Sequence, residues 1–500
     1  MPSWSLAAEA PAKAAEWAKA REQQRKGRQA LEKGASEDRL SRADKAAKII
    51  AELLAKAPEF GVGDHDADLL DLIAGVMFLN PAAAEPLRTA LEKFPETSDP
   101  AKAKAWSQLL ESRRKELLRP TERLFKQALD AGVPSVARDC LDQALTFWPD
   151  HKDVRRNLSE AKQGDRWYGP RDQQRLKAGL VWDMKLGWIV ASARERYAKG
   201  EYFDLQDKTW TTLEAANAKR AAASSRWVIP TEHLIVQGTA PLTVMVDTAN
   251  RLESFYDRVF ASYSGFFVKA GAKGGSDVKL LFGTSAHDPL VINVAKDKEA
   301  YQASLPPRVS AGWSDGMFTS STKESYFYQG SAEVIYHEFT HQILHVFTDT
   351  NRAPAWLTEG AAVYTQGPVF REGRMELGHV DTNSHLRLYI RQSREDKALP
   401  LGKILKLEDG LAWSNSPTPD LNYPAAGAVV QFCMESEQRR YRADFLDFLR
   451  DSYRGETRGY ELWEYLGMDY ASFDKRYATW RDDFIAKPPR EAPAAAKGER

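Results

Sequence analysis

Two histidines and a glutamate stand at a spacing that is typical of a metal site. His337, Glu338 and His341 belong to the segment HEFTH, an HExxH motif. On a helix, positions i and i+4 lie on one face about one turn apart, so both imidazoles can reach the same ion. Glu338 then lies beside the ion, where a carboxylate can accept a proton from metal-activated water. The motif therefore predicts a zinc site with a general base next to it.

A catalytic zinc site usually has three protein ligands and one open position, and the sequence offers two candidates for the third ligand. His345 lies one turn beyond His341, which places it too far along the helix axis from His337, since each turn rises about 5.4 Å. Glu359 lies in the segment WLTEGAA, shortly after Pro354, a residue that favours a first helical turn. Glu359 is the better candidate, and we expect His345 to pack beside the site.

The segments around these residues predict two helices that position them. Residues 331–347 are apolar except for one polar stripe, which indicates a helix buried in a domain core, and Ser331 is a suitable N-cap. Small side chains follow Glu359, at Gly360, Ala361 and Ala362. They should allow the second helix to pack closely on the first.

With HEFTH at 337–341 and WLTEGAA at 356–362, the chain resembles the gluzincin metallopeptidases, and within them the peptidase-MA-like proteins. The resemblance extends more loosely over residues 226–484. It implies one zinc ion bound by His337, His341 and Glu359, with Glu338 as the general base. In that family a later tyrosine stabilises the oxyanion, and Tyr423 in LNYPAA is the best match here. A core aromatic residue would explain Tyr423 equally well.

Length and composition set further limits. A chain of 500 residues suggests two or three domains, and 70 basic residues balance 70 acidic ones, which argues against nucleic acid or an anionic membrane as a general partner. Cys140 and Cys433 lie in different predicted domains, so we expect no disulfide framework. No stretch has the 18 apolar residues of a transmembrane segment, so we expect a soluble protein. Residues 4–10 resemble the end of a signal peptide, which leaves export as an open hypothesis.

The expected fold class is multidomain, mainly α with an α+β part. A helical-repeat-like region should precede a zincin-like metallopeptidase domain with a small mixed sheet and active-site helices. The predicted divisions are 1–40, a charged helix that is solvated or frays; 41–165, a tetratricopeptide-like region; 166–230, a helical connector; 231–485, the peptidase domain; and 486–500, a disordered tail.

The tetratricopeptide-like prediction depends on three amphipathic stretches that are closed by Pro58, Pro95 and Pro149. Stacked helix pairs leave a groove that can bind a protein partner, whereas a plain helical spacer would explain the pattern equally well. Residues 166–230 contain five tryptophans among charged residues, and aromatic residues at this density usually anchor packing. We expect helices there that join the two halves of the chain.

Within the predicted peptidase domain, β-forming residues indicate strands, and apolar periodicity indicates helices. The predicted strands are 232–236, 279–282, 290–294 and 325–328, and the predicted helices are 241–260, 386–391, 425–434, 444–453 and 470–485. An edge strand within residues 310–330 should hold an extended substrate. His233 and His287 fit no ligand spacing and are expected to be structural, whereas His379 and His385 could contact a substrate.

These patterns predict zinc-dependent hydrolysis of peptide bonds, with a peptide or protein as substrate. The alternative is a helical-repeat interaction scaffold whose zincin domain is structural or inactive. The intact Glu338 opposes that alternative, because a metal that only supports the fold does not need a general base.

Overall fold

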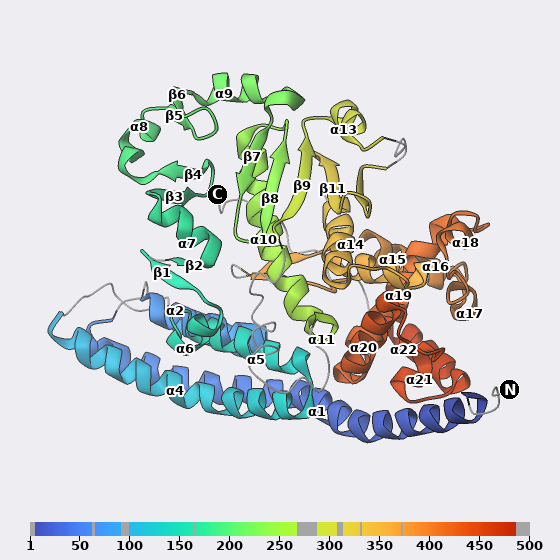
Figure 1. Cartoon of the computed structure of the whole chain (residues 1–500). Coiled ribbons are helices and arrows are strands. Elements are labelled where there is room, and N and C mark those ends of the chain that lie inside the picture. Colours follow the sequence, from blue (N-terminus) through green and yellow to red (C-terminus); the bar gives the residue numbers. More distant parts are fainter. Residues whose placement is uncertain are drawn as a thin grey trace.

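A computed structural model of the chain describes residues 6–62, 66–91, 100–164, 166–267, 288–307, 314–330, 333–371 and 374–486. These residues are mostly helical, with one five-stranded sheet and several hairpins (Figure 1). The predicted fold class, mainly α with an α+β part, is confirmed. None of the helices in these ranges combines the length and the apolar character that a bilayer span requires.

The N-terminal region is a layer of antiparallel helices around an apolar core. Its elements are α1 (Leu6–Lys56), η1 (Ala57–Phe60), α2 (Ala67–Leu79), α3 (Pro81–Leu91), α4 (Pro100–Ala131), α5 (Pro134–Phe147) and α6 (Lys152–Asn157). Ile50 and Val76, from α1 and α2, are completely buried between these helices. Pro58 begins the short η1 and Pro149 follows α5, whereas Pro95 lies outside the described residues. The tetratricopeptide likeness stays a prediction.

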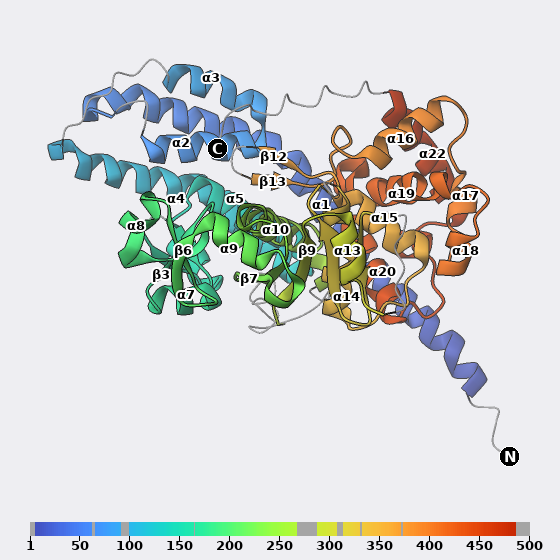
Figure 2. The ribbon, with the colours of Figure 1, turned by 90° about the horizontal axis from the view of Figure 1, so that it is seen from above.

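The first long helix, α1, reaches from this region to the C-terminal helices (Figures 1 and 2). Arg28 donates hydrogen bonds to Asp447 at 2.7 Å and to Asp444 at 3.1 Å, and both acids lie on α20 (Arg442–Arg454). Arg442 in turn donates to Glu32 of α1 at 3.1 Å. These charges can be buried because each is paired. The expected solvated face is therefore wrong for Arg28 and Glu32, and the predicted limit at residue 40 falls inside a continuous helix.

The expected helical connector over residues 166–230 is also wrong. Antiparallel hairpins alternate with short helices here, beginning just before the segment: β1 (Ala161–Gln163) with β2 (Arg166–Tyr168), α7 (Pro170–Lys177), β3 (Leu180–Asp183) with β4 (Gly187–Val190), η2 (Ala191–Ala193), α8 (Arg194–Ala198), β5 (Glu201–Asp204) with β6 (Thr209–Thr212), α9 (Leu213–Arg220) and η3 (Ala223–Ser225). Trp182 faces Trp188 across one hairpin, with ring centroids 5.4 Å apart. Trp210 likewise lies opposite Phe203 in the next hairpin, so these tryptophans form cross-strand pairs, a role that aromatic density alone does not distinguish from helix packing.

The central sheet has the strand order β10-β11-β9-β8-β7. Its strands are β7 (Trp227–Pro230), β8 (Leu234–Gly238), β9 (Leu290–Ala295), β10 (Gly316–Thr319) and β11 (Glu324–Tyr328). The three inner strands are parallel, and the two edge strands are antiparallel to their neighbours. Between β8 and β9 the chain forms the helices α10 (Leu242–Ser262) and α11 (Ser264–Phe267), and between β9 and β10 it forms α13 (Lys298–Ser304). The predicted strand at 279–282 lies outside the described residues.

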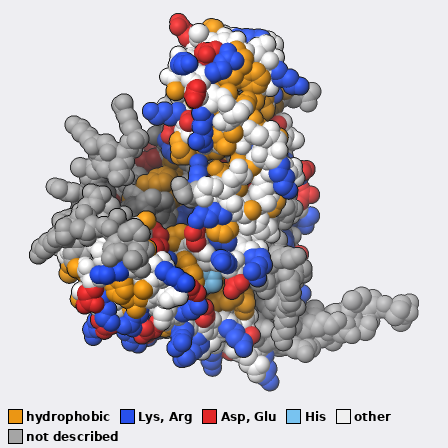
Figure 3. Space-filling model, turned by 90° about the vertical axis from the view of Figure 1, so that its left-hand side faces the viewer, with side chains coloured by type: hydrophobic (Ala, Val, Ile, Leu, Met, Phe, Trp, Pro, Cys, Tyr) orange, Lys and Arg blue, Asp and Glu red, His pale blue; other side chains and the backbone are white. Residues whose placement is uncertain are grey.

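The C-terminal half is a group of helices with one small hairpin. Its elements are α14 (Val334–Thr348), α15 (Ala355–Thr365), β12 (Val369–Arg371), β13 (Arg374–Glu376), α16 (Ser384–Arg394), α17 (Leu401–Ile404), α18 (Gly410–Ser414), α19 (Pro419–Arg439), α20, α21 (Leu462–Leu466) and α22 (Tyr470–Ala486). Cys140 and Cys433 are buried and free, as expected. The predicted tail from residue 487 lies outside the described residues. On the face in Figure 3, basic and acidic side chains are interspersed, which fits the balanced charge of the chain.

Candidate metal centre

Two consecutive helices carry the predicted metal ligands. Helix α14 ends at Thr348, the left-handed backbone of the next residue, Asp349 (φ 54°), turns the chain, and α15 starts directly after Pro354. The side-chain hydroxyls of Thr340 on α14 and Thr365 on α15 lie 2.7 Å apart, so the two helices are joined by a buried hydrogen bond. Residue 331, the predicted N-cap, lies outside the described residues.

The side chains of His337, His341 and Glu359 converge. The Nε2 atom of His337 lies 3.1 Å from Glu359 Oε2 and 3.2 Å from His341 Nε2, and His341 Nε2 lies 3.4 Å from the same carboxylate oxygen. Ligands about 2.0–2.1 Å from a tetrahedral metal ion are about 3.3–3.4 Å from one another, so the three separations fit such an ion. Among the described residues, these three side chains form a group that could hold a metal ion.

Gln366 orients the first histidine. Its Oε1 lies 3.1 Å from His337 Nδ1, so Nδ1 can donate this hydrogen bond while Nε2 stays free to bind a metal. Gln366 itself donates to Glu333 at 3.1 Å, and Glu333 also accepts a hydrogen bond of 2.6 Å from the hydroxyl of Ser384. Sequence reasoning missed Gln366, although its position two helical turns after Glu359 was a usable signal.

Glu338 lies beside the ligand group without belonging to it. Its Oε2 accepts a hydrogen bond of 2.8 Å from the backbone N–H of Phe318 on β10. Burial raises the pKa of the Glu338 carboxyl, and the neighbouring histidines oppose that rise. A buried carboxylate with a raised pKa is suited to accept a proton near neutral pH.

The ligand group is electrostatically coupled. Burial by itself would lower the pKa of His341, but the adjacent Glu359 carboxylate raises it to about 9. Burial would raise the pKa of Glu359, but the two histidines hold it well below its usual range. The carboxylate therefore stays ionised, which is the form that binds a cation.

Tyr423, the predicted oxyanion donor, lies near the group on α19. Its ring centroid is 6.0 Å from that of His337. The ring stacks on His385 at 5.4 Å and meets Trp413 edge-on at 5.0 Å. Burial raises the pKa of Tyr423, so its hydroxyl stays protonated, and burial lowers the pKa of His385 to about 4, so this imidazole is neutral at pH 7. A substrate contact at His385 stays a prediction, and the sequence did not predict the contact of Trp413 with Tyr423.

Three of the other described histidines, at positions 233, 345 and 379, contact residues outside the ligand group. His345 packs against the ring of Phe318, with centroids 5.4 Å apart, as expected for a packed neighbour. His233 pairs with Glu253 through an Nδ1–Oε2 distance of 2.7 Å, which fits a structural role. His379 lies 2.9 Å from a carboxylate oxygen of Glu376. Position 287 lies outside the described residues.

Gly360 of α15 packs closely against α19, whereas the prediction placed this close packing against α14. A Cβ atom at Gly360 would lie 2.6 Å from the backbone oxygen of Ala426, which belongs to α19. The missing side chain therefore allows α15 to approach α19, whereas α14 is joined to α15 at the threonine pair. Close approach at Gly360 sets the distance between the helix that carries Glu359 and the helix that carries Tyr423.

Comparison with known proteins places the ligand group inside a recognised family segment. Residues 331–454 match the family described as a protein of unknown function (DUF1570). The match includes His337, Glu338, His341, Glu359 and Tyr423. No curated protein matches the chain.

Proposed function

We propose that the chain is a zinc-dependent peptidase of the gluzincin type. His337, His341 and Glu359 bind the ion, and Glu338 acts as general base. The observation that carries the proposal is the convergence of these three ligand atoms at separations of 3.1–3.4 Å. Two imidazoles and one carboxylate are a ligand set of catalytic zinc sites, and they leave a fourth position open.

The residues around the ligand group supply the remaining steps. Zinc, when bound, lowers the pKa of a coordinated water and polarises a substrate carbonyl. Glu338 accepts the proton of the attacking water and returns it to the leaving nitrogen. The protonated hydroxyl of Tyr423 donates a hydrogen bond to the carbonyl oxygen as negative charge develops on it.

The edge strand β10 supports a peptide as the substrate. The backbone N–H of Phe318 is directed towards Glu338 on α14, while β11 pairs with the opposite side of β10. Among the described strands, β10 is the outermost on its side of the sheet, so an extended peptide that pairs with its outer edge would place its backbone next to the general base.

The test compares zinc-loaded wild-type protein with two glutamate variants in digests of a broad peptide library. Glu338→Gln should slow cleavage at least about 100-fold while zinc content, measured by mass spectrometry, stays at one ion per chain. Glu299→Gln, an exposed position on α13, should cleave at the wild-type rate. Equal turnover in Glu338→Gln and wild type would overturn the mechanism.

Two further outcomes test the oxyanion role of Tyr423 and the alternative function as a scaffold. Tyr423→Phe should lower turnover by about 10- to 1,000-fold with zinc retained, because only the hydroxyl is lost, and unchanged turnover would leave Tyr423 as a packing residue. Stoichiometric zinc with no cleavage in any library would favour the alternative, a helical-repeat scaffold with a structural or inactive zincin domain.

A further inference from the structure

A second polar cavity lies between the N-terminal helices and the peptidase half. Its volume is about 380 Å³, and α1, α5, α10, α15, β13 and α19 contribute to its walls. Neither the three ligand side chains nor Glu338 line it, so it is distinct from the metal centre. A volume of this size is within the range of small-molecule sites, about 300–1,000 Å³.

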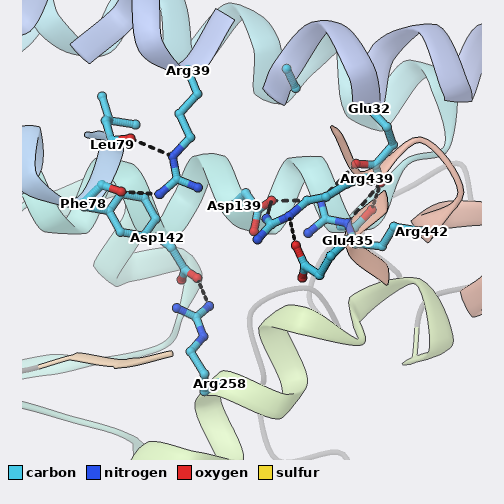
Figure 4. A network of polar contacts seen from close by, with 12 residues as sticks. Glu32, Arg39, Phe78, Leu79, Asp139, Asp142, Arg258, Glu435, Arg439 and Arg442 are labelled. Carbon is cyan, nitrogen blue, oxygen red and sulfur yellow. Dashed lines mark hydrogen bonds and ion pairs between the residues drawn. The ribbon is translucent and has the colours of Figure 1, made fainter. Parts of the chain in front are cut away.

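Three of the four carboxylates that line this cavity have arginine partners. Arg442 donates to Glu32 at 3.1 Å and to Asp139 at 2.8 Å, and Arg439 donates to Glu435 at 3.0 Å. Figure 4 shows these side chains meeting beside α1, while Arg258 of α10 pairs with Asp142 on the other side of the network. The fourth lining carboxylate, Glu376, lies against His379 as described above.

Arg39 adds positive charge to this wall without a carboxylate of its own. Its guanidinium donates to the backbone oxygen of Leu79 at 3.1 Å and to that of Phe78 (Figure 4). Burial and the positive charge of Arg439 lower the pKa of Arg39, and the carboxylates of Asp139 and Glu376 oppose that shift only in part. The charge of the Arg39 guanidinium is therefore incompletely compensated, and an anion beside it would stabilise it.

The backbone around Arg439 supports a binding role. Glu437, Gln438 and Arg439 all have left-handed backbone angles, with φ values of 45°, 58° and 65°. Such angles cost free energy in residues other than glycine and persist where the surrounding structure requires them. Here they place Arg439 at the cavity wall.

Two buried polar atoms in the lining have no hydrogen-bond partner among the residues that the structure describes. One is Nε of Arg42, a side chain that is 10% exposed and whose nearest carboxylate, Asp38, is 3.6 Å from this atom. The other is Oε1 of Gln431, whose amide nitrogen donates to the backbone oxygen of Gly378 at 3.2 Å. Buried polar groups are nearly always paired, so an unused donor and an unused acceptor in one cavity point to a ligand.

We propose that this cavity binds a small organic anion. Its carboxylate or phosphate group pairs with Arg39 and Arg42 on α1, and a hydroxyl or N–H group of the same molecule donates to Gln431 on α19. The two arginines belong to the N-terminal helices, and Gln431 belongs to the C-terminal half of the chain. The bound anion therefore connects these two parts of the protein.

The test is isothermal titration calorimetry of the full-length protein with glycerol phosphate and with malate. Both probes carry an anionic group and a hydroxyl, and glycerol at the same concentrations is the neutral control. Sodium chloride is adjusted to equal ionic strength in every titration, because non-specific charge effects are screened by salt. The two anions distinguish a phosphate site from a carboxylate site.

We expect at least one anion to bind with a stoichiometry near one per chain, and glycerol not to bind. Arg39→Gln and Arg42→Gln should each weaken that binding at least about tenfold, because each removes a charge-assisted hydrogen bond. Gln431→Leu should also weaken the binding of the anion, because it removes the acceptor for the hydroxyl of the bound molecule. Arg119→Gln, an exposed arginine on α4, should bind as the wild type does.

Three results would overturn the proposal: no heat with either anion, equal binding of glycerol, or unchanged affinity in both cavity arginine variants. The first result would mean that water alone satisfies the two polar atoms. If Arg39→Gln fails to fold by circular dichroism, Arg42→Gln and Arg39→Lys decide the matter, since Lys keeps the charge but cannot reproduce the two-pronged guanidinium contact.

Discussion

The carboxylate of Glu338 and the backbone N–H of Phe318 are joined by a hydrogen bond of 2.8 Å. The bond connects the edge strand β10 to the helix that carries two of the three ligand side chains. It holds the proposed general base by a main-chain donor, which no side-chain substitution at position 318 other than proline would remove. The position of the base therefore depends on the central sheet as well as on its own helix.

Gln366 should contribute to metal affinity although it does not contact the metal position. Gln366→Leu removes the acceptor for His337 Nδ1, so the imidazole loses the contact that fixes its orientation. We expect zinc affinity, measured by competition with a chromophoric chelator, to fall about 10- to 100-fold. The matched variant Gln329→Leu, at an exposed position, should keep wild-type affinity. Equal affinities in the two variants would contradict the orienting role.

Close packing at Gly360 should be required for stability. In Gly360→Ala the new methyl group would meet the backbone oxygen of Ala426, which cannot move without shifting α19. The free energy of unfolding in urea should decrease by about 1–3 kcal/mol. Gly34→Ala, on α1 with no atom near the added methyl group, should leave stability unchanged or raise it by up to about 1 kcal/mol. A neutral Gly360→Ala variant would show that the helices separate at little cost.

The buried ion pairs of Arg28 should make α1 an integral part of the fold. Arg28→Gln removes the cation that Asp444 and Asp447 share, while Gln29 still donates to Asp444 and Arg450 still pairs with Asp447, so we expect a loss of about 1–3 kcal/mol in the free energy of unfolding. Lys33→Gln, an exposed residue on the same helix with a side chain that is 52% exposed, should cost less than about 1 kcal/mol. If both variants unfold at the same urea concentration, the contact between α1 and α20 contributes nothing measurable.

The pair of His233 and Glu253 should give stability that depends on pH. Burial alone would lower the pKa of His233, but Glu253 raises it to about 9, above the ordinary value of 6.5. Its contribution is therefore fully present below about pH 6.5 and is lost as the pH rises through 9, a change on the order of 3 kcal/mol. The pKa of Glu253 is lowered, so its contribution is present above its ordinary pKa and is lost as the pH falls below it.

This prediction is checked with urea unfolding of wild type, His233→Gln, Glu253→Gln and the double variant between pH 6 and pH 10. The stability difference between wild type and His233→Gln should shrink towards pH 10, and the coupling energy of the double-mutant cycle should shrink with it. A coupling energy that stays constant over this range would show that the pair is not ionised in the folded protein.

Part of this protein could be predicted from local patterns. The i, i+4 spacing places His337 and His341 on one helix face whatever surrounds them, because helical periodicity is a local property. Apolar periodicity predicts the helices at 241–260 and 470–485, and β-forming residues predict the strands at 290–294 and 325–328, because both signals lie within the element itself. Local reasoning failed over residues 166–230, where four-residue strands are too short to show a period.

Only the tertiary structure decided which distant segments meet. The orienting contact of Gln366, the aromatic neighbours of Tyr423 and the approach of α15 to α19 all join separate elements. The pairing of Arg28 with Asp447 joins residues 419 positions apart, and the second cavity takes its walls from both halves of the chain. Sequence alone shows which residues can bind a metal or carry a charge. Their partners depend on packing, because the free energy of a buried charge or a close helix contact is determined by residues that are remote along the chain.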